Sequence, residues 1–211
     1  MPGWHTLAVG FYEQQVLPRA IDVMLGNRAM GKLRRRALEG LDGTVVELGF
    51  GSGTNVPYYP AAVERVLAVD PSVVGRKLAA KRLAASTVPV EFVGLDGQSL
   101  PLDDHSVDNA LSTWTLCTIP DVDAALAEVR RVLKPGGRLY FLEHGVSSDP
   151  KVARRQHRFD KLQQRFAGGC HLDRDIAALV ARAGFEIEQS ANFVISGPKI
   201  MSYMYAGSAR S

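Results

Sequence analysis

The sequence has few cysteines and no long hydrophobic run. Its two cysteines, Cys117 and Cys170, are too few for a disulfide framework and lack the spacing of a metal site. The longest strictly apolar run is six residues, Ile176 to Ala181, whereas a helix needs about 20 to span a bilayer. No basic start followed by an apolar stretch marks a signal peptide. These absences argue against secreted, membrane-spanning and zinc-finger proteins. We expect a cytoplasmic protein with no transmembrane segment and no metal.

A strong excess of one charge is also missing. The 25 lysines and arginines nearly balance the 22 aspartates and glutamates, which leaves a net charge of +3. A dedicated nucleic-acid binder carries a more one-sided charge, so no nucleic-acid partner is expected. The basic clusters at 34–36 and 151–158 lie in predicted helices, and we interpret them as solvated helix faces. An anionic substrate or peripheral contact with an anionic membrane is the alternative.

The chain does have the composition of a globular domain and an alternation of strands with helices. Hydrophobic residues make up 46% of it, and a chain of this length buries roughly 70% of its unfolded surface in one domain. Apolar runs and helical spacing predict strands at 44–48, 66–69, 90–93, 107–113 and 138–142, and helices at 72–86, 122–133, 151–166 and from Asp173 as N-cap to Arg182, with Gly184 as C-cap.

The two ends of the chain complete the predicted fold. Residues 7–40 are expected to be helical, with interruptions at Pro18 and Gly31, and two final strands are expected at 185–193 and 199–205. Alternating strands and helices imply an α/β fold with a doubly wound, mostly parallel sheet that carries helices on both faces. The last two strands lack a helix between them, so we expect an antiparallel edge.

A glycine-rich turn follows the first predicted strand. Gly49, Gly51 and Gly53 are spaced G-x-G-x-G, and glycine permits both a sharp turn and the close approach of a ligand. The dinucleotide fingerprint needs its third glycine at position 54, which is Thr54, and no Gly-Lys-Ser/Thr of a phosphate loop follows. The turn by itself fits a ligand loop and a plain structural turn equally well. It argues against a nicotinamide-dependent oxidoreductase.

Two aspartates stand at the ends of the next two strands. Asp70 lies 21 residues after Gly49, where a carboxylate can accept both hydroxyls of a ribose; helix capping is the alternative. Asp96 can accept from an exocyclic adenine amine, and an Asx turn is the alternative. Open α/β sheets bind ligands at the carboxyl ends of their strands, so three such signals in order indicate a ligand site.

Five motifs in this order resemble those of class I S-adenosylmethionine-dependent methyltransferases. They are ELGFGSG (47–53), the acidic end of VLAVD (66–70), the DGQSLP loop (96–101), VDNALSTWTLCTIPD (107–121) and RRVLKPGGRLYFLEH (130–144). The resemblance covers roughly residues 44–144. It implies a seven-stranded, Rossmann-like sheet whose last strand is antiparallel, and S-adenosyl-L-methionine as the cofactor.

The same resemblance assigns regions and residues. The single domain, 1–211, divides into an amino-terminal helical arm or lid (1–40), a cofactor-binding core (41–144), and a substrate-side helix, loop and final strands (145–211). The implied cofactor residues are Glu47, Gly49 and Gly51 around the methionine part, Asp70 with Pro71 at the ribose, Asp96 and Gly97 at the adenine, and Thr113, whose backbone meets the methionine amino group. Phe50 stands where small residues are commoner, and it either packs over the cofactor or crowds the loop.

Shorter stretches resemble the methyltransferase-like protein seven group, which contains alkyl thiol methyltransferases. They are 130–144, Gly169-Cys170-His171-Leu172 and 197–201. This resemblance implies S-methylation of a small thiol by in-line methyl transfer. Animal members carry an apolar amino-terminal anchor that this sequence lacks, so membrane residence is not expected.

The acceptor side of the site is less defined. His144 is the candidate catalytic base for an acceptor that must lose a proton, with a supporting role as the alternative. Tyr12, Trp114 and His171 are candidates for binding the substrate, with ordinary core positions as the alternative. O- or N-methylation of a quinol, phenol or amine is the second function. A nicotinamide-dependent oxidoreductase and a non-catalytic cofactor-binding protein are more distant alternatives.

Overall fold

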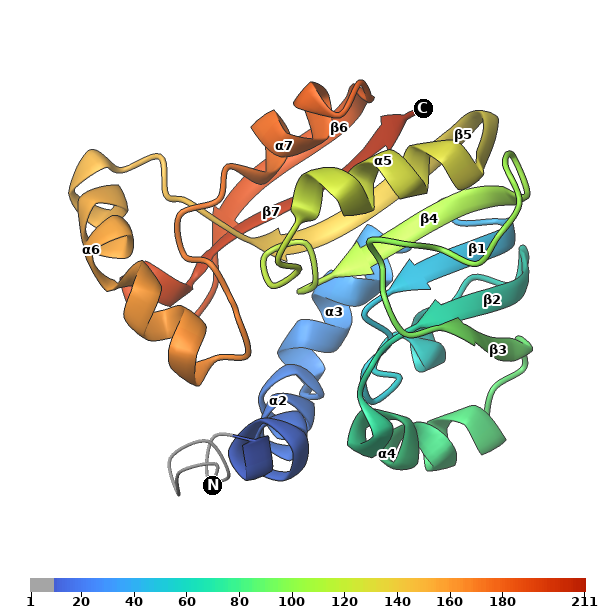
Figure 1. Cartoon of the computed structure of the whole chain (residues 1–211), viewed down its shortest axis with the longest axis horizontal. Coiled ribbons are helices and arrows are strands. Elements are labelled where there is room, and N and C mark those ends of the chain that lie inside the picture. The colour runs from blue at the N-terminus through green and yellow to red at the C-terminus, as the bar shows by residue number, and fades with distance from the viewer. Residues whose placement is uncertain (1–9) are drawn as a thin grey trace, which may run out of the picture.

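The computed structural model describes residues 10–211, which form a seven-stranded sheet with helices on both faces (Figure 1). The strands are β1 (Gly43–Leu48), β2 (Val63–Val69), β3 (Val90–Gly94), β4 (Val107–Thr113), β5 (Leu133–His144), β6 (Glu186–Val194) and β7 (Tyr203–Arg210). Their order across the sheet is β3-β2-β1-β4-β5-β7-β6. The strands β1 to β5 pair in parallel, and β7 is antiparallel to both β5 and β6. The predicted fold class is confirmed.

The segments before and between the strands are mostly helical. They are the π-helical turn η1 (Tyr12–Val16), α2 (Leu17–Leu25), α3 (Arg28–Ala37), the short turn η2 (Val56–Tyr58), α4 (Val73–Ala84), α5 (Val122–Val132), α6 (Pro150–Phe166), α7 (Ile176–Arg182) and the short turn η3 (Lys199–Met201). In Figure 1, α5 and α7 cover one face of the sheet, and α6 stands apart at one end. None of the helices within residues 10–211 is long and apolar enough to cross a membrane.

Each face of the sheet carries its own apolar core because side chains alternate along a strand. Val46 of β1 packs with Leu126 of α5 and Ile176 of α7 on one face. Val45, one residue earlier, packs on the opposite face with Leu38, which follows α3. The central strand is therefore buried on both sides, which is why it reads as a continuous apolar run.

The predicted interruption of the amino-terminal arm at Pro18 coincides with the change from η1 to α2, but the one predicted at Gly31 is wrong. The arm breaks instead at Gly26, and the side chain of Asn27 caps α3 by accepting two backbone N–H groups. Pro18 lies in the first turn of α2, where its ring fits the helical backbone. Gly31 lies inside α3, where any Cβ would overlap the hydroxyl of Tyr58, so the absent side chain permits close packing.

The predicted start of the last helix is also wrong. α7 begins at Ile176 and is capped by Asp175, whose carboxylate accepts the N–H of Ala178 at 3.0 Å. The predicted cap, Asp173, instead lies 2.7 Å from Nδ1 of His157 on α6. Both aspartates fit the capping preference, and the contact with α6 determines which of them caps α7.

The final strand lies later than the predicted range of 199–205. Residues 199–201 form η3, and the strand runs from Tyr203 to Arg210. The pairing with β5 extends from Met204 opposite His144 to Arg210. The small residues near the end of the chain give no apolar alternation, so only this pairing reveals the strand.

Candidate active site

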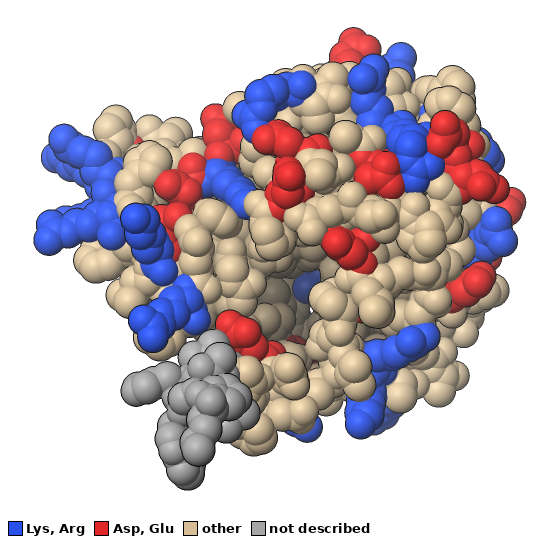
Figure 2. All heavy atoms as spheres, in the orientation of Figure 1, with Lys and Arg blue, Asp and Glu red and all other residues tan. Residues whose placement is uncertain are grey.

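A cavity of about 490 Å³ opens at the carboxyl ends of β1, β2 and β4. Figure 2 shows a hollow in the middle of this face of the molecule. Parallel α/β sheets bind ligands at this edge, and the volume lies in the range of small-molecule sites. The arm closes one side with Leu17, Ile21 and Leu25 of α2, and the loop after α6 closes another at 167–169.

Most, but not all, of the site residues predicted from the sequence meet at this cavity. It is lined by the predicted residues Gly49, Phe50, Gly51, Asp70, Pro71, Asp96, Gly97, Thr113 and Trp114. Four other predicted residues, Tyr12, Glu47, His144 and His171, are not among those that line it. Their roles stay predictions.

The turn after β1 presents backbone to the cavity. Gly49 has a φ of +68°, which favours glycine, and any Cβ there would overlap the side chain of Thr115. A Cβ at Gly51 would meet only the carbonyl oxygen of Gly49, at 3.8 Å. Packing therefore requires glycine at position 49, and the missing side chain at position 51 leaves open space for a ligand.

Asp70 holds the turn after β1 in place. Its Oδ2 accepts the N–H of Gly51 at 2.7 Å, and its Oδ1 accepts the N–H of Ser72 at 2.6 Å. Partial burial raises the pKa of Asp70 above its usual value. The alternative that Asp70 caps α4 is not observed, because Ser72 caps it. Each carboxylate oxygen still has a lone pair for a ribose hydroxyl.

Asp96 lies at the exposed rim of the cavity. Its Oδ1 accepts both the backbone N–H and the side-chain amide of Gln98, each at 2.9 Å. The backbone hydrogen bond is the Asx turn that the sequence left as the alternative. These hydrogen bonds lower the pKa of Asp96. Its Oδ2 accepts no hydrogen bond from residues 10–211, so the turn is compatible with ligand binding.

Glu47 lies behind the cavity wall. It is 1% exposed and accepts hydrogen bonds from Asn55 Nδ2, at 2.9 Å, and from the Tyr59 hydroxyl. Burial raises the pKa of Glu47 to about 7. Its visible role in this structure is to position the Asn55 side chain, and any effect on a bound ligand passes through that residue.

Arg34 is a site residue that the sequence analysis missed. The basic cluster 34–36 was expected on a solvated face, but Arg34 is 3% exposed and lines the cavity, whereas its two neighbours are exposed. Its Nη1 donates to Asn55 Oδ1 at 2.6 Å and to Thr113 Oγ1 at 2.9 Å. Burial lowers the pKa of Arg34 to about 10. One feature of the sequence could have indicated its burial. Arg34 lies four residues after the apolar Met30, so both residues lie on the same face of the predicted helix.

Thr113 and Trp114 end β4 at the cavity. Thr113 Oγ1 also accepts from Asn55 Nδ2 at 3.0 Å, and its carbonyl accepts from the Thr115 hydroxyl at 3.1 Å. Trp114 has a φ of 52°, and its N–H donates to the carbonyl of Leu142 at 2.9 Å. A left-handed backbone at a large residue is uncommon outside strained or functional sites.

His144 lies in a buried cluster next to the cavity. It is 5% exposed, its Nδ1 lies 3.7 Å from Cys170 Sγ, and its Nε2 has no partner among residues 10–211. Cys170 Sγ lies 3.8 Å from Cys117 Sγ. The Cys117 thiol, and then His144, lower the pKa of Cys170 below its usual value. Cys170 directly follows Gly169, which lines the cavity.

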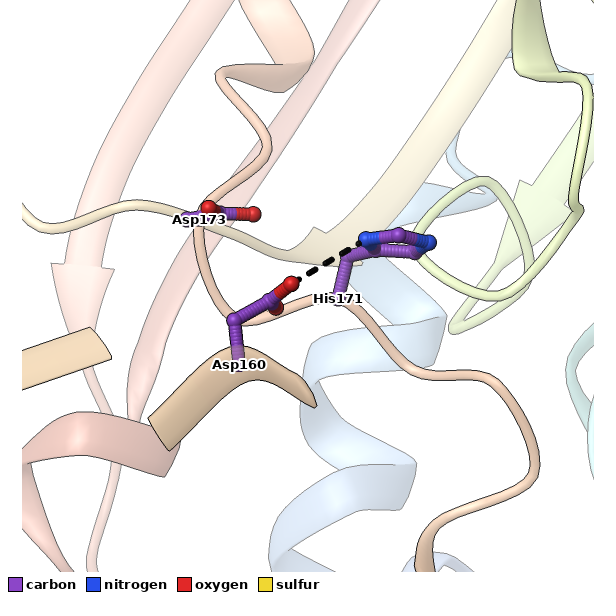
Figure 3. Close-up of side chains that lie close together, drawn as sticks. All are labelled: Asp160, His171 and Asp173. Atoms are coloured by element: carbon purple, nitrogen blue, oxygen red, sulfur yellow. Dashed lines mark ion pairs between the residues drawn. The ribbon is translucent and has the colours of Figure 1, made fainter. Parts of the chain in front are cut away.

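His171 belongs to a polar cluster that ties α6 to the following loop (Figure 3). Its Nδ1 lies 3.5 Å from Asp160 Oδ2, and the Gln164 amide lies at 2.5 Å from Asp160 and 3.0 Å from His171. Ligand atoms of Asp160, His171 and Asp173 lie within 4.8 Å of one another, a spacing compatible with a metal. The Gln164 amide already satisfies two of these groups, so we assign the cluster a structural role. Tyr12 also contacts this region, donating to the Phe166 carbonyl at 2.9 Å.

Known proteins are similar to this chain in sequence. Residues 46–141 match the family described as "Methyltransferase domain". Thiol S-methyltransferase TMT1B of Rattus norvegicus is 34% identical over 148 residues, 67% of this chain and 59% of that protein. Demethylmenaquinone methyltransferase of Clavibacter sepedonicus is 34% identical over 110 residues, 52% of this chain and 44% of that protein. The chain spans less than two thirds of the length of the curated relatives it matches.

Solved structures show the same architecture. The crystal structure of an S-adenosylmethionine-dependent methyltransferase from Mesorhizobium loti has a TM-score of 0.64 at 20% identity, covering 89% of this chain and 100% of that chain. The open space at Gly51, the carboxylate of Asp70 and the unpartnered Nε of Arg34 fit a ligand with ribose hydroxyls and a charged amino-acid part. The chain thus carries a methyltransferase domain of class I, and S-adenosylmethionine is its cofactor.

Proposed function

We propose that the protein transfers the methyl group of S-adenosylmethionine to the sulfur atom of a small thiol. The proposal rests on the kinds of ionisable side chain that line the cavity. They are Glu13, Arg34, Asp70 and Asp96. A thiol with an ordinary pKa near ~8.5 is partly ionised at neutral pH and needs no base from this set. The thiol S-methyltransferases among the relatives support the same choice.

The chain's own residues would act by positioning the acceptor and excluding water. The cofactor supplies an electrophilic methyl group, and in-line transfer requires the acceptor sulfur to be held close to it. Leu17, Ile21 and Leu25, spaced four residues apart on α2, form an apolar wall of the cavity. Trp114 adds an aromatic wall, as its predicted substrate-binding role requires. An apolar surrounding favours the step, because charge is dispersed as the sulfonium reacts. The acceptor we propose is a small, largely apolar thiol.

The other predicted acceptor-side residues keep a supporting role in this proposal. His144 contacts Cys170, and His171 donates its backbone N–H to the carbonyl of Cys117 at 2.8 Å. Tyr12 holds the arm to the end of α6. All three therefore shape the loop 167–171 that borders the cavity, and catalysis by His144 stays a prediction.

O- or N-methylation of a quinol, phenol or amine is the second candidate. Relatives named demethylmenaquinone methyltransferase and ubiquinone/menaquinone biosynthesis C-methyltransferase favour a quinone-type acceptor, but their names do not indicate O- or N-methylation. Such an acceptor needs a proton acceptor in the protein, and His144 is not among the residues that line the cavity. This candidate thus requires a rearranged loop, which the thiol proposal does not.

The test is S-adenosylhomocysteine release with matched acceptors. Apolar thiols are compared with alcohols, phenols, quinols and amines of the same carbon skeleton. We expect release with thiols alone, with a rate that rises with the thiolate fraction. Release with quinols or phenols and none with thiols would contradict the proposal and make His144 the leading base.

We also propose that α6 contacts an anionic membrane surface. Its exposed cations are Lys151, Arg154, Arg155, Arg158, Lys161 and Arg165, and Figure 2 shows cations gathered over this region. Phe159, Leu162 and Phe166 lie beside them and are 43%, 55% and 58% exposed. The one acidic residue of α6, Asp160, is buried. A helix with adjacent cationic and apolar exposed faces is typical of interfacial binding.

Vesicle sedimentation tests the membrane contact. Vesicles of phosphatidylcholine with phosphatidylglycerol are expected to bind the protein, and vesicles of phosphatidylcholine alone are not. Arg154→Glu together with Arg158→Glu is expected to abolish binding. The matched control, Lys77→Glu with Lys81→Glu on the exposed side of α4, is expected to leave it intact. Equal binding to both vesicle types, or equal effects of both variants, would contradict the proposal.

The cytoplasmic location stays a prediction.

A further inference from the structure

Arg34 is a buried cation without an ionic partner among residues 10–211. None of the ion pairs in this part of the chain includes it. Its Nη1 donates to two neutral oxygens, on Asn55 and Thr113. The nearby carboxylate of Glu47 is occupied by Asn55 and Tyr59. A buried cation with no direct ion pair is costly even with the charge of Glu47 nearby, so this arrangement favours an additional anion at its free donors.

The donors that Arg34 leaves free lie together on one edge of its guanidinium. Nε is fully buried and has no partner, and Nη2 makes no hydrogen bond to residues 10–211. The N–H groups of Nε and Nη2 point in parallel, the geometry that matches the two oxygens of a carboxylate. Arg34 lines the cofactor cavity. The free donor edge therefore belongs to a side chain that a bound ligand can reach.

The surrounding residues hold this edge in a fixed orientation. The guanidinium carbon lies 4.6 Å from the centre of the Trp114 ring, which covers one face of its plane. Asn55 and Thr113 fix Nη1, and Glu47 fixes Asn55 in turn. A preoriented arginine loses less conformational entropy on binding than a mobile one. The contacts thus prepare Arg34 for a planar anion in one position.

We propose that Arg34 binds the carboxylate of the methionine part of S-adenosylmethionine, which makes the amino-terminal arm part of the cofactor site. The carboxylate is the one anionic group of this cofactor, whose sulfonium and ammonium groups are cationic. Arg34 touches Thr113, which is predicted to meet the methionine amino group, so the same part of the ligand is expected beside it. The proposal rests on the cofactor alone and not on the thiol acceptor.

A purely structural role makes a different prediction. If Arg34 only pins α3 to the end of β4, its loss weakens every cofactor analogue by the same factor, because all of them need the same folded cavity. If Arg34 binds the carboxylate, its loss weakens only those ligands that carry this group. Decarboxylated S-adenosylmethionine, which keeps the adenosine, the sulfonium and the amine, separates the two roles.

Isothermal titration of the full chain with both ligands, without any acceptor, is the test. We expect the wild-type protein to bind S-adenosylmethionine about 10- to 100-fold more tightly than its decarboxylated analogue, the range for a charge-assisted hydrogen-bonded pair. Arg34→Gln is expected to lose that factor for S-adenosylmethionine and to bind the analogue as the wild type does. The control is Arg36→Gln, an exposed arginine on the same helix, and it should change neither affinity.

Two further measurements keep the proposal falsifiable if Arg34→Gln is poorly folded. Arg34→Lys keeps the charge but lacks the two parallel N–H groups of the guanidinium. It should therefore fold and retain only part of the preference for the carboxylate. The comparison of the two ligands on the wild-type protein needs no variant. Equal wild-type affinity for both ligands, or an equal loss of both in the Arg34 variants, would overturn the proposal. An inactive protein in the thiol assay that still prefers the carboxylate would contradict the proposed acceptor only.

Discussion

The guanidinium of Arg34 lies 4.6 Å from the ring centre of Trp114, and this contact joins the amino-terminal arm to the end of β4. Trp114 has a left-handed backbone, with a φ of 52°, which costs on the order of 1–3 kcal/mol at such a residue. Leu142 on the neighbouring strand holds the Trp114 N–H in this conformation. The backbone strain at the end of β4 therefore places an aromatic ring at the cavity and against the arm.

The carboxylate of Asp70 is expected to be needed for cofactor binding. Asp70→Asn keeps the size of the side chain but replaces one acceptor oxygen by a donor, so a ribose hydroxyl loses its partner. We expect S-adenosylhomocysteine to bind about 10- to 100-fold more weakly in titration calorimetry. Asp103→Asn, at an exposed position in the loop before β4, is the control. Unchanged affinity in Asp70→Asn would contradict the ribose assignment.

Gly49→Ala is expected to destabilise the fold for two separable reasons. The added Cβ must adopt a φ of +68° and must also displace the Thr115 side chain. Gly136→Ala isolates the first cost, because Gly136 has a φ of +80° and nothing lies within 4 Å of an added Cβ. We expect a loss of about 1 kcal/mol at Gly136 and a clearly larger loss at Gly49, from urea unfolding. Equal losses of unfolding free energy at the two positions would show that the Thr115 side chain moves away from the added Cβ without destabilising the fold.

Glu47 is expected to make the protein less stable as the pH rises. Burial raises the pKa of Glu47 from the usual 4.5 to about 7. Between these values the folded state holds a proton that the unfolded state has lost, so stability falls by up to about 1.4 kcal/mol per pH unit. Above pH 7 both states are ionised, and the loss is complete.

The variant Glu47→Gln tests this dependence because an amide stays neutral. Relative to the wild type, its unfolding free energy should improve between about pH 5 and pH 8 in urea titrations. Glu39→Gln, an exposed residue after α3, should show no such trend. A constant difference between Glu47→Gln and the wild type across this range would mean that Glu47 does not change its charge there.

Cys170 is expected to ionise at lower pH than an ordinary thiol. Its pKa is lowered below the usual value, chiefly by the Cys117 thiol and then by His144. Iodoacetamide labelling of Cys170, followed by mass spectrometry, should therefore rise less steeply between about pH 6 and pH 8 than the labelling of an ordinary thiol with a pKa of ~8.5. Cys117 is buried, and its pKa is raised, so it should stay unlabelled. A steep rise in Cys170 labelling would contradict the lowered pKa.

His144→Ala separates a catalytic from a supporting role. If His144 takes a proton from the acceptor, kcat falls while the affinity for S-adenosylhomocysteine is kept. If it only supports the loop through Cys170, a thiol acceptor is methylated at a nearly unchanged rate. The proposed thiol function predicts the second result, and the labelling of Cys170 should then shift to higher pH because His144 no longer lowers its pKa. A selective fall in kcat with a thiol would assign His144 to catalysis.

Sequence patterns predicted those parts of the site that short, contiguous segments of the chain form. The turn at Gly49 and Gly51, and the acidic residues at the ends of β2 and β3, occupy positions that the alternation of strands defines. Their places in the sheet follow from the rule that strand ends of a parallel sheet lie at one edge. The predicted interruption at Gly31 failed because a contact with Tyr58, 27 positions later, explains that glycine.

The sequence by itself determined the fold class and the edge of the sheet where the cavity opens, because periodicity and glycine conformations are local properties of the chain. The cofactor came from the resemblance of five motifs to those of class I methyltransferases. Only the tertiary structure decided that Arg34 lies buried at this cavity, while His144 contacts Cys170 and does not line the cavity. Arg34 reaches Thr113 across 79 positions of sequence. Such contacts depend on how the arm packs against the sheet. The sequence alone therefore does not show which of the three consecutive arginines is buried.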